Sequence, residues 1–128
     1  MPRIESPEVV SAEGRGLSHG GGEIWLVDFG EPVGVEQAGR RPAVIISADR
    51  LNESRAGIAI VAPCTTRRRG LPSHVAIDAD ASGLDAITYA KCEDMKSISN
   101  ERLISRLGAA GPQEMFRMTQ AVGFLIGL

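Results

Sequence analysis

The sequence is poor in aromatic residues and cysteines, and it contains no long apolar run. One Trp, one Tyr and three Phe are its only aromatic residues, so a core must consist mostly of aliphatic side chains. No apolar stretch approaches the ~20 residues that span a bilayer, and the first residues lack the basic-then-apolar pattern of a signal peptide. These absences favour a soluble, cytoplasmic protein that does not associate with a membrane.

Metal-ligand spacings are missing too. Cys64 and Cys92 lie far apart, and neither they nor His19 and His74 have a second Cys or His at the spacing of a metal site. We therefore expect no metal and no cofactor. The cysteines are predicted to be reduced, partly buried thiols, with a redox pair or a thiol nucleophile as the alternatives.

The chain also lacks an excess of positive charge. Its formal net charge of −2 argues against broad, non-specific binding of nucleic acid, although it leaves room for a local basic groove. A length of 128 residues, 43% of them apolar, fits one domain with a modest core. We expect a flexible N-terminal arm over residues 1–21 and a folded domain over residues 22–128.

Short apolar segments separated by polar turns predict a mainly β fold. Pro42 is expected to open its strand and Pro63 to end the next one, because proline cannot donate to a strand ladder. Residues 67–70 are predicted to form a hairpin loop that leads into a returning strand. The expected strands cover 24–29, 42–47, 58–62, 74–77, 87–98 and 104–107, with helical turns near 49–52 and 99–103 and a polar turn at 78–85.

The last segment predicts a helix that begins at Pro112, since proline suits the first helical position. A stripe of apolar residues at helical spacing predicts core packing, with a dimer contact as the alternative: Met115, Met118, Val122, Leu125 and Ile126. Many short strands followed by one helix favour a compact antiparallel β-barrel with an appended helix over a βαβ fold.

Four motifs in this order resemble the MazF/PemK family of toxins, also called Kid. Together they span about residues 22–126. They are Gly22–Phe29 (GEIWLVDF), Gly34–Ser47 (GVEQAGRRPAVIIS), Val61–Thr66 (VAPCTT), and Lys96-Ser97-Ile98 followed by Arg102-Leu103. The second is similar to the family's most diagnostic stretch.

The resemblance implies a CcdB/MazF-like fold, an SH3-like antiparallel barrel with short helices and a C-terminal helix. It also implies a homodimeric toxin of a type II toxin–antitoxin module that cleaves single-stranded RNA (mRNA, tRNA or rRNA). A cognate antitoxin with a flexible acidic tail would inhibit it. The family's catalytic arginine and threonine correspond to Arg41 and Thr65, and its loop glutamate corresponds to Glu36.

These residue types suit metal-independent RNA cleavage. When a ribose 2′-OH attacks the adjacent phosphorus, negative charge gathers on the non-bridging oxygens, and a 2′,3′-cyclic phosphate and a 5′-OH result. The guanidinium of Arg41 and the hydroxyl of Thr65 can both donate to those oxygens. Glu36 is the best candidate for accepting the 2′-OH proton. The alternatives are an ion pair of Arg41 with Glu36 or Asp28 and a loop-bracing role for Glu36.

Residues beside these three are predicted to contact RNA. The expected RNA contacts are Arg40, Gln37, Thr66, Arg67, Arg68 and Arg69. Trp25 and Phe29 could stack bases, but their strand positions favour core packing, and His74 is expected to be structural.

One departure from the family concerns Glu93-Asp94, where many members carry an acidic residue followed by Gln. A carboxylate therefore replaces an amide that could contact RNA, so the family's cleavage motif does not carry over. Two other functions remain as alternatives: a non-enzymatic, CcdB-like gyrase poison and an inactive toxin homologue.

Overall fold

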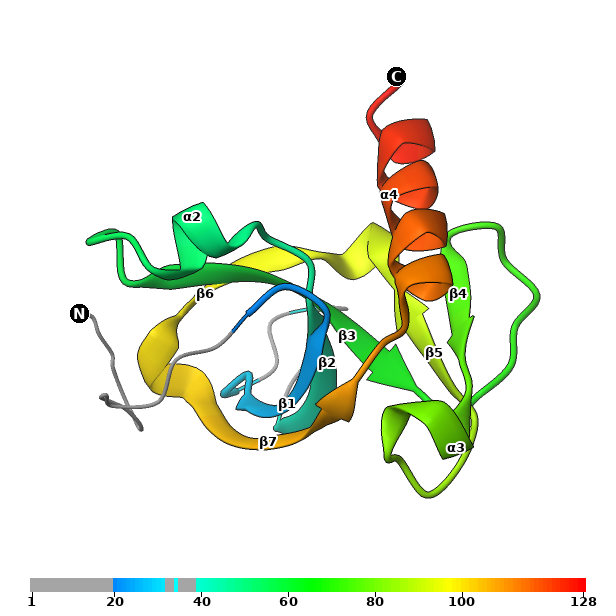
Figure 1. The fold of residues 1–128 in the computed structure, drawn as a ribbon, viewed down its shortest axis with the longest axis horizontal. Coiled ribbons are helices and arrows are strands. Elements are labelled where there is room, and N and C mark those ends of the chain that lie inside the picture. Colours follow the sequence, from blue (N-terminus) through cyan, green and yellow to red (C-terminus); the bar gives the residue numbers. More distant parts are fainter. Residues whose placement is uncertain (1–19, 32–33, 35–38) are drawn as a thin grey trace.

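The computed structural model describes residues 20–31, 34 and 39–128, and these residues form a sheet-rich body with one long helix (Figure 1). The residues predicted to form the N-terminal arm lie outside the described residues up to position 19. The strands are β1 (Glu23–Asp28), β2 (Arg40–Ile45), β3 (Ile58–Thr65), β4 (His74–Ile77), β5 (Thr88–Lys91), β6 (Lys96–Ser99) and β7 (Leu103–Ala109). The helices are α2 (Asp49–Asn52), α3 (Ala79–Ser82) and α4 (Pro112–Leu125), with 3-10 turns η1 (Cys92–Asp94) and η2 (Asn100–Arg102).

The strands pair antiparallel in the order β4-β5-β3-β2-β1-β7, and β6 also pairs with β3. β3 is the centre of this arrangement. One of its edges pairs with β2, while its other edge pairs first with β6 and then, near its end, with β5. In Figure 1, β3 runs from the curled barrel towards the β4–β5 pair. The predicted antiparallel, mainly β fold with a terminal helix is confirmed.

Alternating residues of the central strands supply two apolar cores on opposite faces. The barrel core lies inside the curled strands and contains Trp25, Val27, Phe29, Ala43, Ile45, Ala59, Val61 and Ile98. The helix-side core lies under α4 and contains Ile24, Val44, Ala62, Cys64, Val75, Ile77, Ala90, Cys92, Met118 and Ala121. Because both faces of β2 and β3 are covered, their sequences read as continuous apolar runs rather than as alternation.

The terminal helix packs across β4 and the turn η1, as its apolar stripe predicted (Figure 1). The Glu114 carboxylate accepts from the Gly111 amide at 2.6 Å and from the Asp78 amide at 2.7 Å, which ties the start of α4 to the end of β4. Met118 is buried, with Met115 and Val122 packed beside it. The stripe prediction is wrong for Leu125 and Ile126, which are exposed because the helix ends beyond the sheet; Ala121 is buried instead.

Two proline predictions are wrong. Pro42 lies inside β2, which begins at Arg40, and β2 pairs with β3 only from Ala43 onwards. Pro63 lies inside β3, which continues to Thr65. On one edge of β3 the pairing with β6 stops at Val61 and the pairing with β5 starts at Cys64, so Pro63 falls where that edge changes neighbour. A missing N–H disrupts little at such a position.

Two connections also differ from the prediction. The segment at 67–70 is not a hairpin loop, because β4 pairs with β5 and β5 lies between β4 and β3. The single strand expected over 87–98 is in fact two strands, β5 and β6, with η1 between them. Each of the two pairs with a different part of the same edge of β3. The polar turn at 78–85 contains the short helix α3, and the helical turns near 49–52 and 99–103 are confirmed.

Candidate active site

The two residues predicted to be catalytic come from adjacent strands. β2 and β3 pair as far as Ala43 opposite Pro63, and Arg41 and Thr65 each lie two residues beyond that last pair on their own strands. Because side chains alternate along a strand, Arg41 shares the face of Ala43 and Thr65 shares the face of Pro63, and these two faces are the same. Ala43 belongs to the barrel core, so this face is the barrel face, continued beyond the apolar interior. Arg41 is exposed there and Thr65 is half-buried.

The backbone leaves the hydroxyl proton of Thr65 available. The Thr65 Oγ1 atom accepts a hydrogen bond from the Arg67 amide at 3.1 Å, which closes a small turn at the end of β3. That bond uses one lone pair of the oxygen, while the O–H group can still donate. The turn therefore holds the hydroxyl in place as a donor for an external acceptor.

Positive charge is concentrated around this pair. Arg40 and Arg41 occupy the first two positions of β2, and Thr66 and the run Arg67–Arg69 follow directly on the end of β3; all of them are exposed. Asp28, opposite Arg40 on β1, is the acidic neighbour on that side. In a chain with a net charge of −2, this grouping is a local basic surface.

The segment between β1 and β2 is closed at its base. The Phe29 amide donates to the Gly39 carbonyl at 2.9 Å, and the Gly39 amide donates to the Gly30 carbonyl at 2.8 Å. An Arg102 Nη1 group donates to the Asp28 carbonyl at 3.0 Å. Two predicted site residues on this segment, Glu36 and Gln37, lie outside the described residues.

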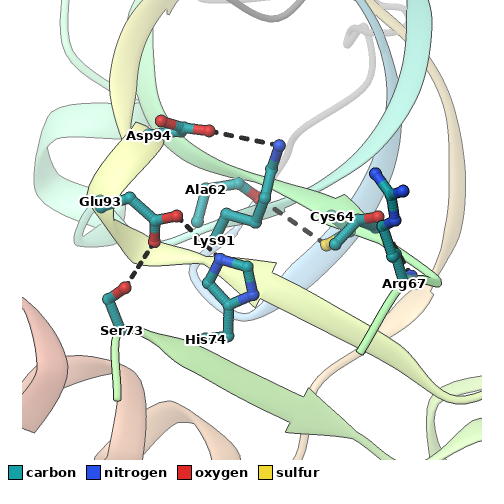
Figure 2. Close-up of polar contacts among 9 residues, drawn as sticks. Ala62, Cys64, Arg67, Ser73, His74, Lys91, Glu93 and Asp94 are labelled. Atoms are coloured by element: carbon teal, nitrogen blue, oxygen red, sulfur yellow. Dashed lines mark hydrogen bonds and ion pairs between the residues drawn. The ribbon is translucent and has the colours of Figure 1, made fainter. Parts of the chain in front are cut away.

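His74 has the structural setting that the sequence predicted. Its side chain is 3% exposed, and its Nε2 atom lies 2.7 Å from Glu93 Oε2, while Ser73 donates to the other carboxylate oxygen at 2.7 Å. Figure 2 shows Glu93 held between the two side chains. Partial burial alone raises the pKa of Glu93, but the hydrogen bonds from Ser73 and His74 outweigh it and hold the pKa below its usual value. Glu93 is thus a carboxylate that fastens η1 to β4.

Asp94, the departure from the family pattern, pairs with Lys91 at 3.2 Å (Figure 2). A glutamine at this position would leave the lysine without a carboxylate partner at that distance. With an aspartate rather than a glutamine at position 94, the charge of Lys91 is offset, and the part of the sheet beyond Thr65 is less positive.

The cysteines are free thiols as predicted, and they are more completely buried than the partly buried thiols that the sequence suggested. Both are free and lie in the helix-side core. Burial raises the pKa of Cys64 to about 12 and that of Cys92 to about 11, so neither is ionised near neutral pH. Although Cys64 precedes Thr65, strand alternation directs it to the opposite face, away from the basic surface. A nucleophilic role for either thiol would require a thiolate that burial disfavours.

Other features of the described chain lie away from Arg41 and Thr65. A groove of about 740 Å³ runs between β4 and α4, where Ile87, Arg117 and Phe124 are among its lining residues. Within the described ranges, no three His, Cys, Asp or Glu side chains are grouped as metal ligands. None of the described helices is long and apolar enough to cross a membrane.

Tyr89 lies beside Thr65, and no sequence motif marks it. Its Cα is paired directly with that of Thr65 across β3 and β5, and its side chain is half-buried. Trp25 and Phe29, the rings that the sequence analysis weighed for base stacking, are 2% and 6% exposed in the barrel core, which confirms their packing role. The missed signal was the single tyrosine in an alternating strand, which becomes informative only once its neighbour strand is known.

Comparisons with known proteins agree with the fold. Residues 21–126 match the family model described as PemK-like, MazF-like toxin of type II toxin–antitoxin systems. The endoribonuclease toxin MazF of Escherichia coli K12 is 35% identical over 107 residues, which is 83% of this chain and 92% of that protein. Endoribonuclease MazF9 of Mycobacterium tuberculosis is 33% identical over 106 residues, 79% of this chain and 90% of that protein.

The fold has the same relatives. The crystal structure of MazE–MazF (form II) from Deinococcus radiodurans superposes with a TM-score of 0.72 at 25% identity, covering 88% of this chain and 98% of that one. Since the family model spans most of the chain and the sequence relatives exceed 30% identity over most of their length, the chain belongs to the PemK-like, MazF-like toxin family of type II toxin–antitoxin systems.

Proposed function

We propose that this protein is the toxin of a type II module and a metal-independent endoribonuclease that cuts single-stranded RNA. The observation that supports the proposal is the placement of Arg41 and Thr65 on one face, at the adjoining ends of β2 and β3 and among exposed arginines. Two donors of this kind suit a phosphate whose non-bridging oxygens gain charge in the transition state. The relatives named endoribonucleases support the reaction class.

The chemistry assigns a role to each group. The Arg41 guanidinium, which stays protonated, binds the scissile phosphate and stabilises the developing charge. The Thr65 hydroxyl donates to the same oxygens, held by its bond from the Arg67 amide. Glu36 accepts the 2′-OH proton, the Arg41 guanidinium donates a hydrogen bond to the leaving 5′-oxygen, and that oxygen takes its proton from water. The products are a 2′,3′-cyclic phosphate and a 5′-OH.

The remaining predicted contacts bind the RNA chain on either side of the cut. Arg40, Thr66 and the run Arg67–Arg69 are exposed and provide phosphate contacts, and Gln37 contacts a base or phosphate from the preceding segment. Such contacts make affinity fall steeply with salt. The same arginines attract the acidic tail of a cognate antitoxin, and the active form is a homodimer. The MazE–MazF relative supports the antitoxin partner.

The test is cleavage of single-stranded RNA by purified protein in the presence of EDTA, with the product ends mapped. We expect 2′,3′-cyclic phosphate and 5′-OH ends. Thr65→Val, which removes one preorganised donor, is expected to slow the reaction by roughly 10²–10³-fold. Arg41→Ala should abolish cleavage, and Arg41→Lys should restore little of it, because lysine lacks the forked donors.

Matched controls separate the site from general damage. Thr119→Val removes an exposed hydroxyl from α4, and Arg50→Ala removes an exposed arginine from α2; both should cleave like the wild type. Products with 5′-phosphate ends, or activity that EDTA abolishes, would refute the mechanism. Absence of cleavage by the wild-type protein would favour the inactive homologue.

A further inference from the structure

The face of the sheet that carries Thr65 extends beyond β3 onto the two strands next to it. Thr65 is opposite Tyr89 on β5, and Tyr89 is opposite Ala76 on β4. One step along the same face, Lys91 is opposite His74. Opposite residues of antiparallel strands share a face, so the Tyr89 side chain projects beside that of Thr65.

Tyr89 is the one aromatic ring in that position. The chain's five aromatic residues are all described, and two of them, Trp25 and Phe29, are buried in the barrel core. Phe116 and Phe124 are 63% and 71% exposed, but they lie on α4, which covers the opposite face of β4 and β5. Any stacking of a base next to Thr65 by an aromatic ring of this chain therefore depends on Tyr89.

The surroundings of Tyr89 make it a fixed and open platform. β5 is paired on both sides, and both residues that flank Tyr89 in the strand are buried, Ala90 in the helix-side core and Thr88 as a polar residue that is 5% exposed. The backbone is therefore held while the ring stays half-buried. The residue opposite on β4 is Ala76, which is small and exposed, so the paired position on that side places no large side chain against the ring.

The charges on this face favour one orientation of a bound nucleotide. Arg41 and the run Arg67–Arg69 surround the Thr65 end. At the other end, Figure 2 shows the carboxylates of Glu93 and Asp94 beside His74 and Lys91. A phosphate is attracted to the first end, whereas at the second end Asp94 offsets the charge of Lys91 and Glu93 pairs with His74, so that end offers a phosphate no comparable attraction.

We propose that Tyr89 is the stacking platform for the base next to the scissile phosphate, and thereby a determinant of which RNA positions are cut. The base is one ribose away from its phosphate, a span similar to the distance of about 4.8 Å between neighbouring strands. The proposal rests on the proposed function for the identity of the phosphate at Thr65. Because stacking acts on binding, Tyr89 affects affinity and position preference more than the chemical step.

The test uses a single-stranded oligonucleotide with 2′-fluoro sugars, which cannot be cleaved, and with the fluorescent base 2-aminopurine at each position in turn. Stacking on an aromatic ring quenches this base. In the wild-type protein we expect quenching at one or two adjacent positions. Tyr89→Leu should lose the quenching and bind about 5- to 150-fold more weakly, while Tyr89→Phe keeps both properties.

Controls and kinetics separate the possible outcomes. Phe116→Leu, which removes an exposed ring from α4, should change nothing, and the melting temperature of Tyr89→Leu checks its folding. On cleavable RNA, Tyr89→Leu should raise KM with a smaller effect on kcat and change the distribution of cut positions. Quenching that survives in Tyr89→Leu, or a wild type that fails to bind or to quench, overturns the proposal.

The two proposals can fail separately. If the wild type binds and quenches but cleaves no RNA, the stacking platform stands and the nuclease function falls. If the wild type cleaves and Tyr89→Leu cuts the same positions with the same KM, the nuclease function stands and the platform falls.

Discussion

At the scale of single residues, strand alternation separates chemistry from packing. Cys64 and Thr65 are neighbours, yet the thiol lies in the helix-side core and the hydroxyl faces the basic surface. A one-residue shift in the pairing register of β3 would exchange the faces of these two side chains. The Thr65 hydroxyl would then be buried without its turn, and the Cys64 thiol would be exposed. The buried residues on both sides of this strand therefore also fix which group the protein presents on the basic surface.

Glu93 provides a prediction at the same scale. Its folded-state pKa lies below its usual value because of the bonds from Ser73 and His74, so the ionised carboxylate stabilises the fold above about pH 4.3, the ordinary value for glutamate. This stability is lost as the pH falls through the folded-state pKa. We expect Glu93→Gln to unfold in less urea than the wild type at pH 6, and the difference to vanish in stronger acid.

Urea titrations between pH 2.5 and 7 measure this difference. Glu101→Gln, a change at an exposed glutamate of η2, serves as the control and should follow the wild type throughout. A Glu93→Gln penalty that stays constant down to pH 2.5 would show that the contribution of Glu93 is independent of its charge.

At the scale of elements, the sequence predicted where strands are but not which strands are neighbours. Apolar runs placed five strand regions well and merged β5 and β6 into the sixth, because burial patterns are local. The pairing of β4 with β5 rather than β3, and the passage of β3 through Pro63, depend on partners far away in the chain. A proline ends a strand only where a partner needs its N–H, and no local pattern reports that.

Gly108 gives a prediction for the contact between elements. It lies in β7 beside the end of α3, where a Cβ atom would be 1.7 Å from the Ser82 carbonyl oxygen. Neither backbone can move without disturbing its own pairing, so we expect Gly108→Ala to destabilise the fold by roughly 3 kcal/mol. Chemical denaturation monitored through Trp25, which is buried, measures the loss.

Gly123→Ala is the matched control. Gly123 lies in α4, where an added Cβ would make an ordinary contact at 3.8 Å with Leu128. Alanine has the higher helix propensity, so this variant should be about 0.5–1 kcal/mol more stable than the wild type. Equal effects of the two substitutions would mean that β7 and α3 are not closely packed in solution.

At the scale of the whole molecule, the site joins two parts of the sheet through β3. Arg41 belongs to the barrel, Tyr89 belongs to the β4–β5 pair, and Thr65 lies between them at the end of the shared strand. The motifs in the sequence predicted Arg41 and Thr65 as site residues, because each lies in a recognisable local stretch. Tyr89 could not be found in that way, since its relation to Thr65 exists only across a strand pair.

The two cysteines of the helix-side core can report the global unfolding of the molecule, and one of them lies on the same shared strand. Cys64 and Cys92 lie in that core under α4, and burial raises their pKa values to about 12 and about 11. Thiol reagents react with the thiolate, so at pH 8 both residues should be labelled only when the core opens, and at equal rates. Mass spectrometry of a labelling time course measures both.

Met118→Ala, which leaves a cavity in the core at a cost of roughly 2–5 kcal/mol, should accelerate the labelling of both cysteines equally, and in guanidinium both should react at once. Labelling of Cys64 while Cys92 stays protected would show instead that the end of β3, with Thr65 on it, opens independently of the rest of the molecule.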